Sequence, residues 1–480
     1  MAITSLTFLC FVAAVVVAFH LGRSAGYRQW VFAAANAIFI ASQVSAAPAL
    51  APLLIFVALG YPAVRWLRHG PGWGLVLCLV ATIAAFVVLK RFAFLDGLLE
   101  LPFPYLTMGL SYVLFRLIHL MVDAQTGELP AAISPLRYFN YSCNFLCFVS
   151  GPIQRYQDFA ATDDQPAGLD EARVFAAFAR VVRGFLKVAV ISAGLNYVFG
   201  QIAPPLLAAE ALPGARFAIA FSAAAVVYTL YLYFNFSGYM DIVIGLGSLL
   251  GQNLPENFRQ PFAARNFLDF WTRWHITLSE WFKTYLFNPL LKALAGRFRA
   301  PAVMPWLGVL AFFVTFLVMG LWHGTTAVFV AYGLLLGGGA AVNKLWQLAM
   351  TRRLGKAGYR ALAEQPVYRG LCRGATFAYF ALALVCLWVD LAQFGGLLRT
   401  LGAAGVAASF ALIAVAGALV LPVLDLVMAT LRRAGAGLAV STASPAGFVG
   451  RNAALAAQVL LVLMASSFFH KAPEFVYRAF

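Results

Sequence analysis

Charged residues are scarce in this chain. Asp, Glu, Lys and Arg make up only 11% of its 480 residues, hydrophobic residues make up 62%, and the mean hydropathy is +0.84. Soluble globular domains carry roughly 25% charged residues, so this composition excludes a water-soluble enzyme. The sequence is that of an integral membrane protein.

The chain also lacks the short alternating segments of a transmembrane β-barrel. Its apolar runs are continuous, and a spanning helix needs about 20 such residues. We therefore expect an all-α polytopic membrane protein with roughly 11–13 transmembrane helices. Two polar, glycine-containing pieces, 138–151 and 238–251, are expected to be broken or re-entrant segments. The predicted spans cover residues 3–19, 30–47, 49–64, 73–89, 104–122, 173–199, 216–236, 303–322, 327–342, 376–392, 404–428 and 452–469.

Acidic residues are fewer than basic ones, 18 against 34, which gives a formal net charge of +16. We expect no nucleic-acid partner, because the Lys and Arg residues gather in the connecting loops, as they do on the cytoplasmic side of membrane proteins. The loops after residues 342 and 428 carry such clusters, so the tail after the last span is expected on the outer face. Lys90 and Arg91 do not fit this scheme, and the topology of residues 73–150 stays open.

Several sequence motifs are missing. The six cysteines lie singly in apolar runs, and Cys143 and Cys147 have neither the spacing nor the partners of a zinc or redox pair. Without an HExxH motif, or an acidic residue at ligand spacing from a histidine, we expect no metal site. The absence of a GxSxG elbow argues against a serine hydrolase. No repeat or Pro/Ser-rich linker divides the chain, so residues 1–480 are expected to form one membrane domain.

Two of the six histidines stand in unusual surroundings. His323 interrupts an apolar run in VMGLWHGTTAVF, residues 318–329, and an imidazole at that depth is a functional candidate that faces protein or a water-filled cavity. His275 lies within residues 256–292, a segment of alternating aromatic and charged residues that predicts a helix at the membrane interface. A neutral histidine can accept a proton from a hydroxyl, so we expect a general base.

The residues around both histidines resemble the core of the membrane-bound O-acyltransferase (MBOAT) family. WHITLSEWFKTYLFNPL followed by GLWHG carries the resemblance, together with FSGYMDIVIGLGSLLGQNLPENF at 236–258 and FVSGPIQRYQDF at 148–159. The matching region extends over about residues 148–337. Within the family the sequence is most similar to the bacterial branch of alginate and cellulose O-acetylation proteins and teichoic-acid D-alanyl transfer proteins.

The resemblance implies a role for each matching position. His323 would be the catalytic base and His275 its partner, beside a central tunnel across the membrane. The supporting residues would be Asn257 and Arg273, with Trp274 and Trp322 as tunnel walls; Asp241 is either a buried structural acid or a further site residue. Gly333, Gly337, Gly338 and Gly339 are expected to let helices pack closely.

The resemblance also implies the substrates and partners. An acyl thioester, either acetyl-CoA or a phosphopantetheinyl carrier protein, would approach as a substrate from the cytoplasm, and no bound cofactor is expected. A hydroxyl that is deprotonated beside the thioester carbonyl forms an ester without an obligatory acyl-enzyme. The chain would lie in the bacterial inner membrane and serve O-acetylation of an exopolysaccharide.

The chain ends with the aromatic hexapeptide FVYRAF, residues 475–480. Similar hexapeptides close some members of this branch, which implies that Tyr477 receives the acyl group and passes it to a separate extracytoplasmic transferase that acts on the polysaccharide. A phenol ionises more easily than a sugar hydroxyl, so such a relay is chemically reasonable. The alternative is an aromatic anchor at the membrane interface.

Three other functions remain possible on the sequence alone. D-alanyl transfer to an envelope polymer would use the same chemistry. A transporter would use His323, His275, His119, Arg116 and Asp241 as a proton or substrate path, although the paired repeats typical of transporters are absent. A scaffold in a polymer-secretion complex would leave the histidines unexplained.

Overall fold

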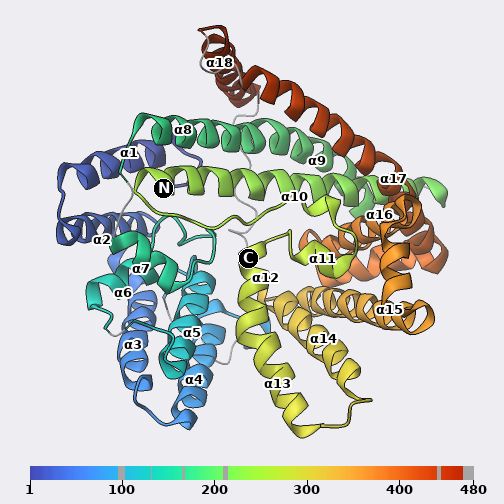
Figure 1. The fold of residues 1–480 in the computed structure, drawn as a ribbon, viewed down its shortest axis with the longest axis horizontal. Helices are drawn as coiled ribbons and strands as arrows, with labels where there is room; N and C mark the ends of the chain where they lie inside the picture. The colour runs from blue at the N-terminus through green and yellow to red at the C-terminus, as the bar shows by residue number, and fades with distance from the viewer. Residues whose placement is uncertain (96–102, 131, 165–167, 209–213, 440–444, 469–480) are drawn as a thin grey trace. The chain divides into compact units, whose positions relative to one another are not determined.

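The computed structural model describes residues 1–95, 103–130, 132–164, 168–208, 214–439 and 445–468 (Figure 1). Within these ranges the chain is helical, and its only β-type pairing is the isolated bridge between Phe258 and Trp274. The predicted all-α class is therefore confirmed. Seven helices are long and apolar enough to cross a membrane: Ala47–Leu67, Gly72–Lys90, Ala215–Leu249, Met304–Trp322, Val328–Glu364, Pro366–Leu387 and Leu391–Val427.

The described residues fall into two compact units. The first contains Met1–Phe185 and Gly238–Glu256, and the second contains Leu186–Ser237 and residues 257–468 where described. The prediction of a single domain over residues 1–480 is not tested by this division, because both units contribute to one long helix, α10 (Ala215–Leu249).

The first unit is organised around the buried helix α5 (Leu110–Thr126), against which three other helices pack. Helices α1 and α2 form a neighbouring pair, and serine side chains cap the N-termini of both (Figure 1). The bounds of the other helices are α1 Leu6–Leu21, α2 Ala25–Ala41, α3 Ala51–Leu67, α4 Gly72–Lys90, α6 Pro135–Ser142, α7 Tyr156–Asp164 and α8 Glu171–Phe185.

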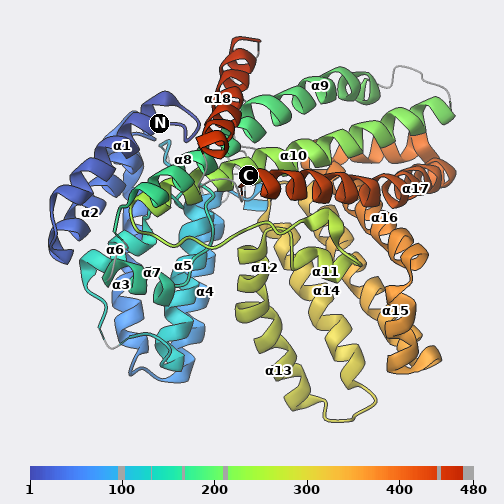
Figure 2. The ribbon, with the colours of Figure 1, turned by 45° about the horizontal axis from the view of Figure 1, so that its top comes forward.

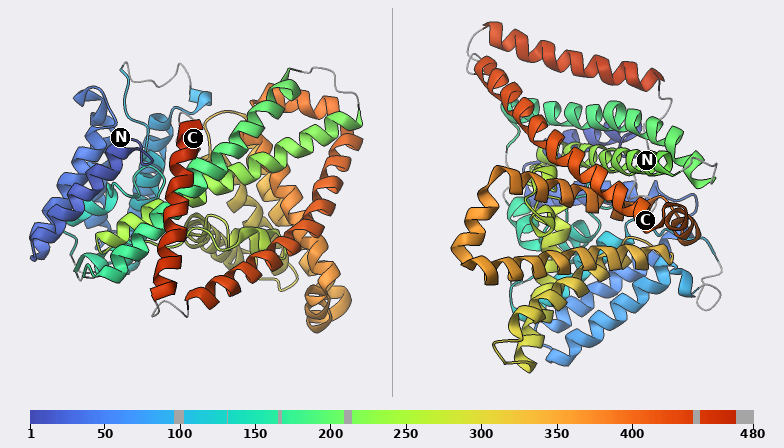
Figure 3. Two further views of the ribbon diagram at one scale, coloured as in Figure 1. Left: turned by 90° about the horizontal axis from the view of Figure 1, so that it is seen from above. Right: turned by 90° about the vertical axis from the view of Figure 1, so that its right-hand side faces the viewer.

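The second unit consists of longer helices and one short, broken segment. Helix α14 (Met304–Trp322) packs along α15 (Val328–Glu364), and α16 (Pro366–Ala383) packs along α17 (Leu391–Ala439), as Figures 2 and 3 show. The short helices of the broken segment precede α14 in the chain. The remaining bounds are α9 Ala193–Leu207, α11 Phe267–Trp271, α12 Ile276–Phe282, α13 Asn288–Arg297 and α18 Pro445–Phe468.

Glycine allows α14 and α15 to approach backbone to backbone. A Cβ atom on Gly320 would overlap the backbone of Gly333, and one on Gly333 would lie 2.6 Å from the carbonyl oxygen of Leu317. Gly337 meets the Phe313 carbonyl oxygen in the same way, at 2.7 Å. These contacts bear out the close packing predicted for these glycines. Gly338 is the exception, because its nearest neighbour, a Tyr379 hydroxyl, is 3.8 Å away.

This difference predicts opposite effects for two neighbouring substitutions. Gly333→Ala should lower the free energy of unfolding in detergent by about 1–3 kcal/mol, because the new methyl group meets backbone atoms that cannot rotate away. Gly338→Ala should be neutral or stabilising by up to about 1 kcal/mol, because alanine favours a helix over glycine. Denaturant titration followed by circular dichroism measures both. Equal destabilisation by the two substitutions would contradict the packing described here.

Two predictions about the helices need correction. Residues 238–251 are not re-entrant: they form the end of the continuous helix α10, where Gly245 lets the chain pack against Val181 and Ala177 of α8. Residues 256–292 are not one interfacial helix: the short helix α11 is separated by the turn at His275 from a continuous helical run over residues 276–297, made of α12, a π-helical stretch and α13. Seven helices meet the length and composition of a span where 11–13 spans are expected. Helices α1, α2 and α5 are 16–17 residues long, whereas α8, the π-helical stretch Leu186–Ser192 and α9 form one continuous helical run over the expected span 173–199. Residues 138–151 are broken as predicted, since α6 ends at Ser142.

Candidate active site

His275 lies at the turn between α11 and α12, in the second unit. Its backbone has left-handed angles, φ 44° and ψ 53°, which are uncommon for a residue other than glycine. Backbone hydrogen bonds hold the chain on both sides of it: Arg259 N–H donates to the Arg273 carbonyl (3.0 Å), and Ile276 N–H donates to the Asn257 carbonyl (3.0 Å). Two distant stretches of chain therefore present His275 in a fixed position.

The Asn257 side chain strengthens the same turn. Its Oδ1 atom accepts hydrogen bonds from the Thr277 backbone N–H (3.1 Å) and from the Thr277 hydroxyl (2.7 Å). Asn257 is fully buried, so each of these bonds replaces one that water would otherwise supply. Asn257 thus holds the turn that carries His275 through its contacts with Thr277, and its role in the reaction stays a prediction.

The left-handed backbone at His275 predicts a difference between two variants that both lack the imidazole. A side chain with a Cβ atom in this conformation costs roughly 1–2 kcal/mol, and strain of this kind is typical of functional sites. His275→Gly should therefore unfold at higher denaturant concentration than His275→Ala, by about 1 kcal/mol in free energy. If the alanine variant were the more stable one, the turn would not have the conformation described.

His323 follows the last residue of α14. Its Nδ1–H donates a hydrogen bond to the carbonyl oxygen of Met319 (2.6 Å), because a carbonyl can only accept. In the neutral imidazole this leaves the lone pair on Nε2, which is the atom that can take up a proton. The rings of Trp322 and Tyr332 pack edge-on against the imidazole, with centroids 4.9 and 5.4 Å away.

The structure brings the two histidines together. Both are buried, with 1% of His275 and 3% of His323 exposed. Burial, followed by the electrostatic interaction with His323, holds the pKa of His275 well below its usual value. The ring of Phe236 from α10 lies edge-on against His275, at 4.8 Å between centroids. Burial therefore favours the neutral form of His275.

The other predicted site residues lie in different surroundings. Trp274 is buried in an aromatic cluster and stacks on Phe270 at 5.5 Å. Arg273 forms an ion pair with Asp269 (3.0 Å), one helical turn away. Asp241 belongs to the first unit, where it pairs with Arg180 and Arg183 at 3.0 and 3.3 Å; its role in the site stays a prediction. Tyr477 lies outside the described residues.

Sequence reasoning missed several residues that build the site. Met319 acts through its backbone carbonyl, which no side-chain pattern reveals. Thr277 acts by donating hydrogen bonds to Asn257, and it belongs to no recognisable motif. Arg373 of α16 donates to the Phe262 carbonyl and forms an ion pair with Asp425 (2.6 Å). The sequence does contain a signal for Arg373, because an arginine next to an apolar run is expected to pair with an acid or a backbone carbonyl.

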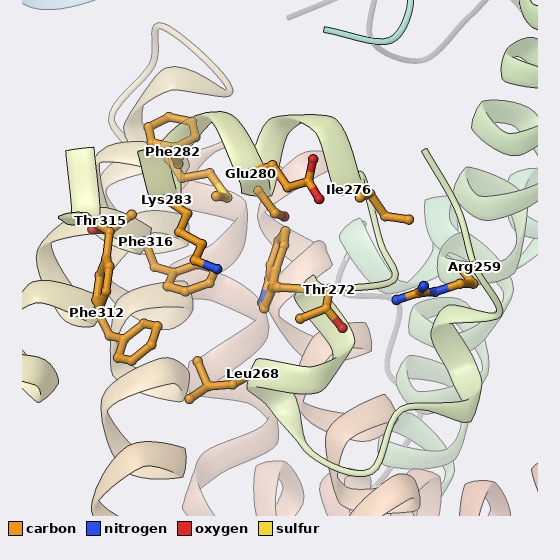
Figure 4. A pocket seen from close by; sticks show the side chains of 14 residues that line it. Arg259, Leu268, Thr272, Ile276, Glu280, Phe282, Lys283, Phe312, Thr315 and Phe316 are labelled. Atoms are coloured by element: carbon orange, nitrogen blue, oxygen red, sulfur yellow. The ribbon is translucent and has the colours of Figure 1, made fainter. Parts of the chain in front are cut away.

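A cavity of about 400 Å³ lies near the two histidines, although neither imidazole is among its lining residues. Ile276, which follows His275 directly, lines it, and so does Met319, whose carbonyl binds His323. Figure 4 shows Phe312 and Phe316 on one side of the cavity and Arg259 on the other. The lining residues are Arg259, Leu268, Trp271, Thr272, Ile276, Ser279, Glu280, Phe282, Lys283, Phe287, Phe312, Thr315, Phe316 and Met319.

The chemistry available here is that of imidazole beside an apolar chamber. Among the described residues, no group of three or more His, Cys, Asp or Glu side chains is placed to hold a metal ion. A buried neutral histidine with a fixed tautomer can deprotonate a hydroxyl that enters the chamber.

Comparison with known proteins supports the sequence resemblance. Residues 87–371 match the model of the MBOAT, membrane-bound O-acyltransferase family, a wider region than the predicted core of 148–337. The chain is 30% identical to a teichoic acid D-alanyltransferase of Bacillus subtilis (strain 168) over 47% of its own length and 56% of that protein. It is also 30% identical to a probable alginate O-acetylase of Pseudomonas putida, over 61% of this chain and 56% of that protein.

A third relative is named for a different polymer, peptidoglycan. A peptidoglycan O-acetyltransferase of Helicobacter pylori is 40% identical over 122 residues, which is 25% of this chain and 22% of that protein. The chain thus aligns with little more than half the length of the relatives above, and with less of this one.

Proposed function

The chain belongs to the membrane-bound O-acyltransferase family and is a multi-pass membrane protein, and from this premise we propose that it transfers an acetyl group from a thioester to a hydroxyl. The observation that carries the proposal is the fixed tautomer of His323 beside His275 and the cavity. Nε2 of His323 is the base, and the cavity receives the acyl donor.

The acyl group passes directly from the thioester to the acceptor hydroxyl, without an acyl group on either histidine. Nε2 of His323 takes the proton of the acceptor hydroxyl, and the oxygen attacks the thioester carbonyl. The C–O bond forms, the C–S bond breaks, and the thiolate leaves and recovers a proton from the imidazolium. His275, neutral and held at the strained turn, orients the reacting groups.

The cavity lining supports acetyl transfer over D-alanyl transfer. A D-alanyl group carries an ammonium that needs a carboxylate partner once it leaves water. Glu280 is the only acid among the residues described as lining the cavity, and it is exposed to solvent. The residues next to the histidines, Trp271, Ile276 and Met319, suit an uncharged acyl group better.

The complete pathway would cross the bacterial inner membrane. Acetyl-CoA or an acetylated carrier protein delivers the acyl group from the cytoplasm, where the basic loops lie. On the outer face, the hydroxyl of Tyr477 receives the group, and a separate extracytoplasmic transferase passes it to an exopolysaccharide. The alginate O-acetylase relatives support this choice of acceptor.

A transporter is less well supported. His119, which would belong to its proton path, accepts a hydrogen bond from the Tyr156 N–H at Nε2 (2.9 Å) and faces Asp123 with Nδ1 at 3.4 Å. The guanidinium of Arg116 donates to the carbonyls of Ser142 and Cys147. Both residues therefore hold the polypeptide chain, as structural residues do.

Release of free thiol by the purified protein tests the enzyme against the transporter and the scaffold. We expect multiple turnovers with an acetyl thioester once an acceptor is present, and slower release with the D-alanyl thioester. Transport of a substrate without consumption of any acetyl or D-alanyl thioester would overturn the proposal.

A further inference from the structure

The cavity beside the histidines is apolar inside and cationic at its rim. Its buried walls include Trp271, Phe316 and Met319, which are at most 6% exposed. Arg259 and Lys283 also line it, but both are exposed to solvent. Neither cation forms an ion pair with an acid anywhere in the described ranges. Glu280 is a third exposed, charged residue of the lining, so two positive charges and one negative charge lie at the solvent-exposed part of the cavity.

Lys283 lies at a defined distance from the reaction centre. His275 stands at the start of α12, and Ile276, Ser279 and Lys283 follow along the face of the helix that lines the cavity. Lys283 lies eight positions after His275 in the chain, which corresponds to a rise of about 12 Å along the helix. Lys283 also begins a π-helical stretch, Lys283–Phe287, and such stretches occur frequently at functional sites.

Arg259 is positioned independently of α12. Its backbone N–H donates to the Arg273 carbonyl in the pairing that also holds His275. Figure 4 shows Arg259 on the opposite side of the cavity from Lys283, with both cationic groups directed toward the space between them. A ligand that enters this space meets positive charge from two sides.

We propose that Lys283 and Arg259 are the specificity-determining residues for an anionic group that the acyl donor carries at the far end of a long, uncharged arm. This inference rests on the proposed function, since the donor occupies the cavity. A phosphorylated pantetheine thioester has this form, because two amide-linked units separate its phosphate from the thioester carbonyl. An acyl phosphate does not, because its phosphate is attached directly to the acyl group and would lie among the apolar walls.

Trp271 supports the same type of arm. Its indole Nε1–H has no hydrogen-bond partner within the described part of the chain, although only 4% of the residue is exposed. A buried donor without an acceptor is costly, and Trp271 lines the cavity. An amide carbonyl of the arm would provide the missing acceptor after a small movement of the ring.

Four acetyl donors test the proposal with the full-length protein: acetyl-CoA, S-acetyl-4′-phosphopantetheine, S-acetylpantetheine and acetyl phosphate. For the wild type we expect KM to be about tenfold lower for the two phosphorylated thioesters than for S-acetylpantetheine, with similar kcat. A charge-assisted contact between the phosphate and the two cations accounts for a difference of this size. Acetyl phosphate should be a poor donor. In Lys283→Gln and Arg259→Gln the advantage of the phosphorylated thioesters should shrink, whereas Lys292→Gln, which removes an exposed lysine outside the cavity, should keep it.

Equilibrium binding of acetyl-CoA to the His323→Gln protein separates this proposal from the proposed function. If no donor is turned over but Lys283→Gln in that background weakens binding, the anion subsite stands and the acyltransferase does not. If turnover proceeds and the KM ratio between the phosphorylated and unphosphorylated thioesters is unchanged in both variants, the subsite is wrong and the acyltransferase stands. Equal loss of affinity for S-acetylpantetheine would also overturn the subsite.

Discussion

Replacement of His323 by glutamine is expected to lower kcat for acetyl transfer by about 10²–10⁴-fold, the usual contribution of a general base. Glutamine can still donate a hydrogen bond toward the Met319 carbonyl, so the end of α14 keeps its contact, but no atom remains that takes up a proton near neutral pH. KM for the donor should change little. Thiol release measured over a range of donor concentrations gives both constants.

A second histidine provides the control. His69 is exposed and lies in the first unit, so His69→Gln should leave kcat and KM unchanged. Thermal unfolding of the His323→Gln protein within a few degrees of the wild type would confirm that the loss is chemical. Wild-type kcat in a correctly folded His323→Gln protein would remove His323 from the reaction.

Replacement of Tyr477 by phenylalanine is expected to lower acetylation of the polysaccharide in cells to below about one hundredth of the wild-type level. The variant lacks the nucleophilic oxygen that would accept the acyl group. Phenylalanine keeps the aromatic ring, and with it any anchoring at the membrane interface. Only the hydroxyl that would carry the acyl group is lost. Acetate released from the isolated polymer by mild alkali measures the effect.

The matched control is Tyr197→Phe, which removes the hydroxyl of another exposed tyrosine. It should leave the acetate content of the polymer unchanged. Normal acetylation in the Tyr477→Phe strain would mean that the hexapeptide is an anchor and that the acceptor hydroxyl approaches the histidines directly.

Composition and motifs are sufficient to predict the fold class, and they single out the two histidines as candidates. Only helices and closed barrels satisfy the backbone within a bilayer, and long continuous apolar runs are typical of helices. His275 and His323 are detectable because imidazoles are rare in such surroundings. Asn257 follows from the resemblance, but its contact with Thr277 does not, since hydrogen bonds between residues 20 positions apart have no signature in a single sequence.

Other features depend on tertiary contacts that a sequence does not reveal. The glycines of residues 238–251 suggest a broken helix, yet Gly245 serves close packing against α8 and α10 is continuous. The tautomer of His323 depends on a backbone carbonyl, and the cationic rim formed by Arg259 and Lys283 joins two segments of the chain. A residue pattern predicts a helix or a turn, whereas the contacts that a residue makes in the folded protein determine what that residue does.

The central claim is that this protein transfers an acyl group from a thioester to a hydroxyl, with His323 as the general base. The most direct test is the intact mass of the purified wild type and of the His323→Gln protein after incubation with acetyl-CoA, followed by peptide mapping. We predict one acetyl increment on the fragment that contains Tyr477 in the wild type, and none in the variant. The same increment in both proteins, or no increment and no thioester consumption in the wild type with any donor, would contradict the account.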